Sequence, residues 1–302
     1  MWKKFRDSYF LYSFLRDPVA LGSFLILAVL VFMAVFAPLL APQNPYDGAS
    51  IDIMDAEIAP SWVSGETRFL LGTDAQGRDI WSTILYGARV SLLIGIGAVI
   101  LQAALGIIVG LVSGYRGGRV DAILMRIADV QLSFSSYMVA IFFGAVLQTA
   151  VGVGGYANIA LPFLILVIGI SEWPQYARTV RASVLAEKKK EYVEAARVIG
   201  LKPRRIMWRH ILPNTLTPVL VISTVQVANA VMSEAALSFL GLGMPANQPS
   251  LGSLIKSGFT YVLSGSWWIT LFPGVVLVLL VLSINLLGDW LRDFLNPKLY
   301  KD

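Results

Sequence analysis

Val90–Tyr115 reads VSLLIGIGAVILQAALGIIVGLVSGY, and this stretch decides the class of fold. It contains no charged side chain over 26 residues, and Gln102 supplies its only side-chain amide. A membrane-spanning helix needs about 20 apolar residues, because each residue rises about 1.5 Å and the hydrocarbon layer is roughly 30 Å thick. The stretch therefore predicts a transmembrane helix.

Four other apolar stretches complete a pattern of six spans. Val19–Ala37 carries no charge, and the stretches from Pro213 to about Leu240 and Trp268–Gly288 are each long enough for one span. Val130–Ser171 is uncharged over 42 residues, which is too long for one span, and the glycines of Gly152–Asn158 divide it into two spans with a tight hairpin. We therefore predict an all-α integral membrane protein with six transmembrane helices and both termini on one side.

The composition agrees with a membrane protein and excludes several kinds of chemistry. Of the 302 residues 56% are hydrophobic and 14% charged, against about 25% charged in soluble domains. The absence of cysteine and the single His210 exclude disulfides and a multi-histidine metal site. No lysine follows a glycine, so the phosphate-binding GxxxxGK[ST] loop is missing. We expect no catalytic residue, no metal and no nucleic-acid partner, and read the chain as a conduit or a scaffold.

The basic residues predict the orientation. The terminal segments and the loops around residues 116–126 and 175–209 hold 20 of the 24 Lys and Arg residues, whereas the other side holds four. Because cytoplasmic loops retain positive charge, we predict cytoplasmic segments 1–18 and 290–302, a retained first helix 19–37, an extracytoplasmic segment 38–89 and a five-helix core 90–289.

The polar centre of the chain contains a short amphipathic helix, EYVEAARVIG, at Glu191–Gly200. Its predicted apolar face consists of Tyr192, Ala195, Ala196 and Ile199, and the other faces carry Glu191, Glu194 and Arg197. Gly200 suits the position after a helix end, and Pro203 suits the start of a second helix that we expect to end near Pro213. The segment fits a helix on lipid, a solvated loop or an element docked into a groove of another protein, and its small alanine face favours docking.

This segment resembles the EAA signature of permease subunits in ATP-binding-cassette importers. The positions in step with that signature are Glu194, Ala195, Ala196, Gly200, Leu212 and Pro213, while Ile211 stands one place later than usual. The resemblance implies that residues 187–212 form cytoplasmic coupling helices that enter a cleft of an ATPase subunit.

Further motifs resemble the C-type permeases of dipeptide, oligopeptide and nickel importers over nearly the whole chain. They are GTDAQGRD, YGARVSL, GYRGGRVDAILMRIADV, EAALSFLGLG, WWITLFPG and NLLGDWLRDFLNPKL. Ser135 in place of a proline, NQPSLG in the external loop and Trp290 in place of a glycine depart from the family pattern. The resemblance implies a type I importer permease in a bacterial inner membrane, surrounded by lipid. It also implies a B-type permease partner, two ATPases that bind ATP and Mg²⁺, and an extracytoplasmic binding protein.

Several polar residues are candidates for function. An acid inside a membrane is costly, so we expect Glu234, and with it Asn229, to line the pathway or to contact the partner permease. We expect Asp129 and Glu172 to pair with Arg126 or Arg178. The external motif comprises Gly72, Thr73, Asp74, Gly77, Arg78 and Asp79. It predicts a turn that caps an interfacial helix at Arg78–Val90 or, alternatively, contacts a binding protein.

The expected function is half of the translocation pathway of an ATP-driven importer for di- or oligopeptides. A permease for nickel chelates or another small solute stays open, because no residue distinguishes these substrates. An ion-gradient carrier is a less favoured alternative, since the two halves of the chain show no convincing internal repeat. A non-transporting membrane scaffold is a third alternative.

Overall fold

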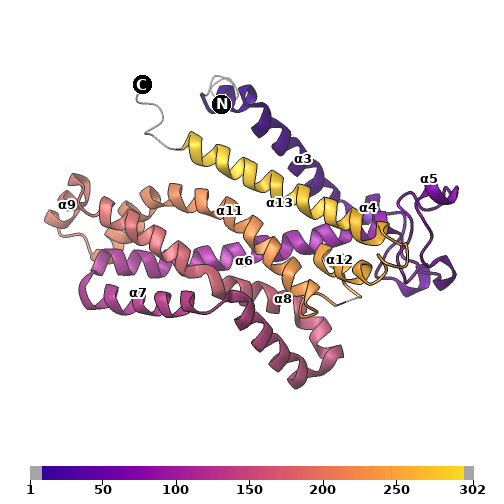
Figure 1. Ribbon diagram of the computed structural model, residues 1–302. Helices are drawn as coiled ribbons and strands as arrows, with labels where there is room; N and C mark the ends of the chain where they lie inside the picture. The colour runs from indigo at the N-terminus through magenta and orange to yellow at the C-terminus, as the bar shows by residue number, and fades with distance from the viewer. Residues whose placement is uncertain (1–8, 246, 296–302) are drawn as a thin grey trace.

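A computed structural model describes residues 9–245 and 247–295, and the described residues form helices and no β-strand (Figure 1). The helices are α2 (Tyr9–Arg16), α3 (Pro18–Val35), α4 (Ala37–Leu40), η1 (Gly48–Ser50), η2 (Ile53–Asp55), α5 (Ser61–Ser64), α6 (Ile80–Arg116), α7 (Gly118–Ser133), α8 (Ser136–Glu187), α9 (Glu191–Val198), α10 (Pro203–Ile206), η3 (Met207–Ile211), α11 (Leu212–Phe239), α12 (Leu251–Phe259) and α13 (Trp268–Phe294). The predicted terminal segments 1–18 and 290–302 lie partly outside the described residues.

Five helices are long and apolar enough to span a membrane, and the number is six if the bent pair Gly118–Ser133 with Ser136–Gly152 is counted as one span. The predicted all-α membrane fold is thus confirmed, and two helices extend beyond the predicted spans. The bent pair begins at Gly118, within the predicted loop, and is bent by 78° between Ser133 and Ser136. Helix α6 begins at Ile80, because the predicted interfacial helix is continuous with the second span.

The central contact of the fold joins α6 to the second part of α8. Three glycines of α6, each four residues from the next, leave no room for a side chain. A Cβ would lie 2.2 Å from Tyr176 Cβ at Gly106, 2.5 Å from the Ala177 carbonyl oxygen at Gly110 and 2.8 Å from Val184 Cβ at Gly114. Such small-residue stripes let two membrane helices approach closely, since packing replaces the hydrophobic effect as the driving force inside lipid.

α8 consists of two helices that turn at Gly152, where φ is +75°. Only glycine adopts this conformation without strain, and the predicted hairpin is confirmed. Beyond it, α8 returns along α6 and is tied to α7 by ion pairs of Arg181 with Asp121 and of Arg178 with Asp129. The expected pairing of Asp129 is therefore confirmed.

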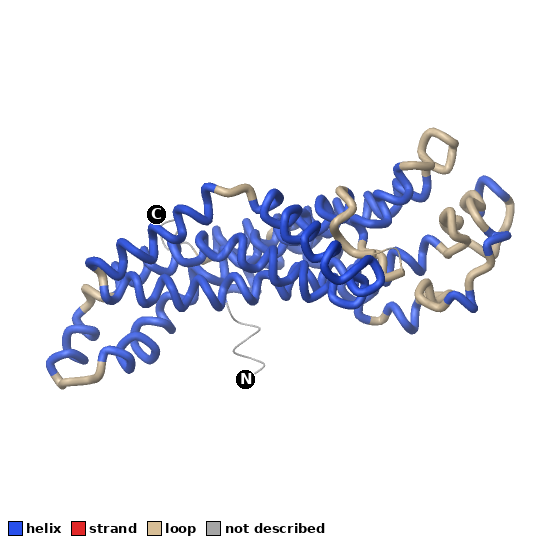
Figure 2. Tube along the Cα trace, turned by 90° about the horizontal axis from the view of Figure 1, so that it is seen from below, coloured by secondary structure: helices blue, strands red, loops and turns tan. Residues whose placement is uncertain are grey.

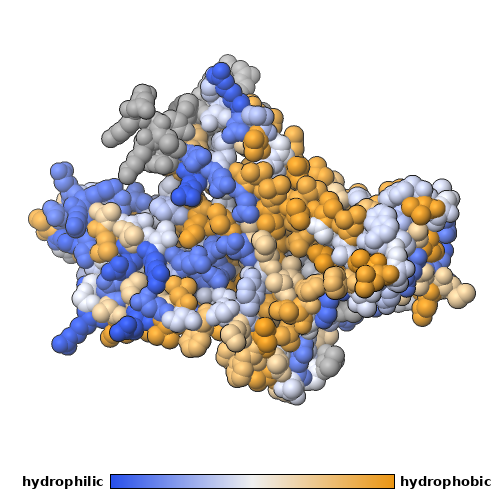
Figure 3. Space-filling model, in the orientation of Figure 1, coloured by the Kyte–Doolittle hydropathy of each residue, from blue (hydrophilic) through white to orange (hydrophobic). Residues whose placement is uncertain are grey.

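The loops gather at two ends of an elongated helical body (Figure 2). One end carries the short segment α9, and the other carries residues 41–79, which we call the cap (Figure 1). Between them an apolar band crosses the molecule, and the α9 end is strongly hydrophilic (Figure 3). The band has the distribution expected for a protein that is surrounded by lipid at its middle.

Candidate functional site

The cap ends in the turn Gly72–Asp79, which is stabilised by hydrogen bonds and an ion pair between its own residues. The buried Asp74 carboxylate accepts bonds from the backbone N–H of Gln76 at 2.8 Å and of Arg78 at 3.0 Å, and it pairs with the Arg78 guanidinium at 2.7 Å. Trp268 Nε1 donates to the Thr73 carbonyl oxygen at 3.1 Å, which anchors the turn to α13. These buried contacts favour the prediction that Asp74 stabilises the turn over the alternative that it contacts a binding protein.

Asp79 joins this turn to α6, and two glycines of the turn pack closely against other parts of the cap. Asp79 accepts from the backbone N–H of Ser82 at 2.9 Å and so caps the first turn of α6, as predicted. Gly77 has φ +79°, and a Cβ there would lie 2.0 Å from the Asp52 carbonyl oxygen. Gly72 is similarly confined, with φ +83° and a Cβ position 2.4 Å from the Ile58 carbonyl oxygen. The motif therefore fixes the entry into the membrane.

At the opposite end, α9 packs one narrow face onto its own chain. Val193 and Ala196 are buried and join the hydrophobic cluster of α6, α8 and α11. Of the predicted apolar face, only Ala196 is buried against the same chain, while Tyr192, Ala195 and Ile199 are exposed. The apolar residues of α9 thus serve two surfaces, one internal and one open.

The open surface of α9 is apolar at its C-terminal end. Val198 is 89% and Ile199 76% exposed, while Glu191, Glu194 and Arg197 surround them. Exposed apolar side chains in a rim of charge are typical of a protein contact.

Tyr192 fixes the N-terminal part of α9. Its hydroxyl donates to the Glu187 carboxylate at 2.5 Å and accepts from Asn214 Nδ2 at 3.1 Å. Partial burial raises the pKa of Tyr192, and the bond to Glu187 raises it further, so the hydroxyl remains a donor at neutral pH. Tyr192 therefore joins the ends of α8 and α11 to the start of α9.

Gly200 ends α9 in a Schellman motif. The N–H of Leu201 donates to the Ala196 carbonyl at 3.1 Å, and the N–H of Gly200 donates to the Arg197 carbonyl at 2.9 Å. Gly200 has φ +78°, as its predicted position after the helix end requires. Leu201 then packs against the central hydrophobic cluster, which holds the exposed face of α9 in a fixed direction.

The predicted second short helix does not end near Pro213. Helix α10, the π-helical turn η3 and α11 form one continuous helix from Pro203 to Phe239. Proline cannot donate a hydrogen bond and clashes with the carbonyl four residues earlier. The wider turn accommodates it, with the N–H of Leu212 bonded to the Met207 carbonyl, five residues back. Leu212 and Pro213 thus lie inside a continuous helix.

Glu234 is fully buried within this chain, so the expected exposure to a pathway or to a partner is not observed. Ser91 Oγ on α6 donates to its Oε2 at 2.9 Å, and Ser238 Oγ donates to its Oε1 at 2.5 Å. Ser91 also accepts from the backbone N–H of Leu251, at the start of α12. We call Glu234, Ser91, Ser238 and Ser250 the Glu234 cluster. It joins α6, α11 and the start of α12.

Asn229 is exposed and lines a cavity of about 300 Å³ where the bend between α7 and α8 meets α6 and α11. Glu172 also lines this cavity. The prediction that it pairs with a nearby arginine is wrong, because its partners are Ser136 at 2.7 Å and Gln175 at 2.6 Å.

The comparisons with known proteins agree with this geometry. Residues 106–301 match the family described as binding-protein-dependent transport system inner membrane component, and residues 1–60 match the N-terminal TM domain of oligopeptide transport permease C. The chain belongs to the family of binding-protein-dependent transport system inner membrane components. It is therefore a multi-pass inner-membrane protein.

Two relatives of this inner-membrane component are similar over nearly their whole length. The di/tripeptide transport system permease protein DppC of Pseudomonas aeruginosa is 38% identical over 95% of this chain and 90% of its own. The dipeptide transport system permease protein DppC of Haemophilus influenzae is 35% identical over 96% and 94%. A solved chain of the MetNI methionine ABC transporter in an inward facing conformation has a TM-score of 0.56 at 21% identity, covering 71% of this chain and 97% of its own. That likeness supports the type I importer permease fold.

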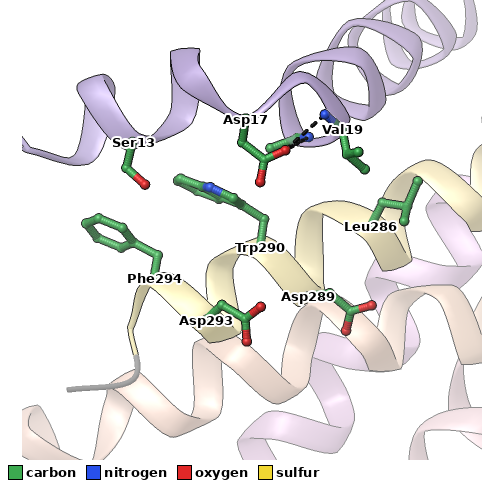
Figure 4. Close-up of a pocket in the computed structure, with 9 residues that line it drawn as sticks. Ser13, Asp17, Val19, Leu286, Asp289, Trp290, Asp293 and Phe294 are labelled. Carbon is green, nitrogen blue, oxygen red and sulfur yellow. Dashed lines mark hydrogen bonds between the residues drawn. The ribbon is translucent and has the colours of Figure 1, made fainter. Parts of the chain in front are cut away.

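One departure from the family pattern is explained by the contact of α13 with α2 and α3 (Figure 4). Trp290 stacks on Phe294 with the ring centroids 5.5 Å apart and meets the edge of Phe14 at 5.0 Å. It fills the space that a glycine would leave beside a cavity of about 350 Å³. Asp17 borders the same cavity and caps α3 through the N–H groups of Val19 and Ala20.

Sequence reasoning missed the internal partners of these sites. Val193 was not assigned to a face of α9, although its spacing of three from Ala196 signals a shared side. Ser91 lies 143 residues from Glu234 and carries no local signal of that contact.

Proposed function

We propose that this chain is one of two permease subunits of an ATP-driven importer for short peptides. The observation that carries the proposal is the exposed apolar face of α9, held rigidly by the cap at Gly200 and surrounded by charge. Relatives named as dipeptide or di/tripeptide permeases, at 35–38% identity, support the substrate class.

In this proposal α9 is the contact with an ATPase subunit in the cytoplasm. The α9 end is the hydrophilic end of the molecule (Figure 3), and it carries the basic residues of α7, α8 and α10. The cap end carries few basic residues, which supports an extracytoplasmic position. The two termini would then be cytoplasmic.

The proposed mechanism needs no chemistry from this chain. Two ATPase subunits bind ATP and Mg²⁺, while this chain holds no cofactor. Their closure moves α9, and the continuous helix from Pro203 to Phe239 carries the displacement into the membrane. Because packed elements switch between discrete arrangements, the movement alternates the side on which the pathway is open.

A homologous B-type permease would form the other half of the pathway. A substrate-binding protein would deliver peptide at the cap end, where the rigid turn Gly72–Asp79 supports the docking surface. A permease for nickel chelates is the second candidate in the same fold, but both of the relatives described above are named for peptides.

Affinity purification in mild detergent, followed by reconstitution, tests the proposal. We expect a second six-helix protein and two P-loop ATPases to copurify. ATP should then drive peptide uptake into proteoliposomes when the binding protein is present. Uptake that follows an ion gradient without ATP, or a chain that purifies alone, would refute it.

A further inference from the structure

The cavity at the bend between α7 and α8, which we call the bend cavity, is polar although one of its walls belongs to the uncharged run of α6. Gln102 on its wall is 12 residues from Val90 and 13 from Tyr115, the limits of the uncharged run of α6. The polar lining residues are Gln102, Ser135, Ser136, Glu172, Gln175, Asn229 and Ser233, with Tyr137 beside them. None of the lining residues is a lysine or an arginine.

A chain of hydrogen bonds runs along one wall and ends on a carboxylate. Asn229 Nδ2 donates to Gln226 at 2.8 Å, and Gln226 Nε2 donates to Gln175 at 3.0 Å. Gln175 and Ser136 then donate to the two oxygens of Glu172. Each of these hydrogen bonds takes up an N–H or O–H donor of the wall, whereas the amide and carboxylate oxygens have further lone pairs that can accept. Among the described residues no cation pairs with Glu172.

Gln102, on α6, adds an acceptor to the lining of the cavity. The residue is 1% exposed, its Nε2 donates to the Ile168 carbonyl at 3.2 Å, and its Oε1 accepts no hydrogen bond within the described part of the chain. A buried acceptor without a donor is unfavourable in a low-dielectric region. Gln102 therefore offers a free acceptor, and Glu172 offers a negative charge that no cation of the described residues pairs with.

We propose that the bend cavity binds an alkylammonium group, and that this group is the protonated amino end of a peptide in transit. An ammonium group offers three N–H donors and a positive charge, which match the Glu172 carboxylate and the amide oxygen of Gln102. A volume of about 300 Å³ lies at the lower limit of small-ligand sites, so the cavity holds one end of a peptide. This assignment rests on the proposed function for the source of the amine.

Cysteine labelling of the whole importer tests the site without relying on transport. The chain contains no cysteine, so a Ser233→Cys substitution introduces its only thiol, on the cavity wall. We expect a cationic methanethiosulfonate to label it about ten-fold faster than an anionic one, because a nearby carboxylate attracts the cation. Glu172→Gln should abolish this preference. The control Asp289→Asn, which removes an exposed carboxylate outside the cavity, should retain it.

Competition identifies the source of the amine. A dipeptide with a free amino end should slow labelling by the cationic reagent, whereas its N-acetyl form should not. Equal labelling by both reagents would overturn the cation site. Protection by ethylammonium, but by no peptide, would overturn the peptide assignment. If the wild-type importer takes up no peptide with ATP, the proposed function fails, and the charge preference still decides the site.

Discussion

Substitution of Gly200 tests whether the direction of α9 couples ATP hydrolysis to transport. Gly200 has φ +78°, and a Cβ built there meets no atom of this chain within 4 Å. Gly200→Val therefore strains the backbone without a clash inside the chain. The strain acts on the Schellman bonds that hold Leu201 against the core.

The expected size of the effect follows from the left-handed conformation. An L-residue other than Asn or Asp pays about 1–2 kcal/mol there, which corresponds to a factor of roughly 5–30 in population. Gly200→Asn retains the conformation at a smaller cost and adds a side chain of similar size. Gly265→Val is the matched control, because Gly265 has φ +104°, no atom within 4 Å of its Cβ position and a place outside α9.

The assay is the ratio of peptide uptake to ATP hydrolysis in proteoliposomes. We expect Gly200→Val to lower this ratio about 5- to 30-fold, Gly200→Asn to lower it much less and Gly265→Val to leave it unchanged. Equal loss in the Val and Asn variants would show that bulk at the partner interface, and not backbone strain, matters. An unchanged ratio in Gly200→Val would refute the role of α9 as a rigid lever.

Three further substitutions test the packing, each by thermal unfolding in detergent. Gly106→Ala should destabilise the fold by about 1–3 kcal/mol through overpacking, whereas Gly274→Ala, whose Cβ meets no atom within 4 Å, should not; equal midpoints would contradict the close contact of α6 with α8. Glu234→Leu should cost about 1–3 kcal/mol by leaving buried hydroxyl groups unpaired, and Glu234→Gln should cost less; a neutral Leu variant would contradict the hydrogen-bonded cluster. Trp290→Ala should lose two aromatic contacts worth about 0.5–1.5 kcal/mol each. An unchanged unfolding midpoint would contradict the role of Trp290 in joining α13 to α2.

Features that depend on local chemistry were predictable from the sequence. The hairpin at Gly152, the helix cap at Asp79 and the end of α9 at Gly200 each follow from the conformation or hydrogen bonding of one residue. The bend between α7 and α8 was not predictable, because no glycine or proline marks Phe134 and Ser135 and the uncharged run continues across them. Long apolar stretches establish that a span exists without fixing where it bends.

The sequence also did not predict which apolar residues of α9 are buried and which are exposed. Periodicity places apolar residues on helix faces, but it does not tell which face packs on the same chain and which meets a partner. Glu234 and Glu172 show the same limit, since both are acids in apolar surroundings. Contacts with residues distant in sequence bury the first in a serine cluster and leave the second beside a cavity.

A single helix links the proposed coupling surface to the proposed amine site. Pro203–Phe239 has 37 residues, a length of about 55 Å at 1.5 Å per residue. Its first turns pack with the buried face of α9, and further along it carries Asn229 at the bend cavity. Beyond that point Glu234 joins it to α6 and α12. Because the Glu234 cluster holds the far end, a displacement of α9 would tilt the helix about that end and would move Asn229 relative to Gln102 and Glu172. Closure of the ATPases would thus reshape the bend cavity beside the Gln102 and Glu172 acceptors, which gives a physical route from ATP hydrolysis to the release of an ammonium group.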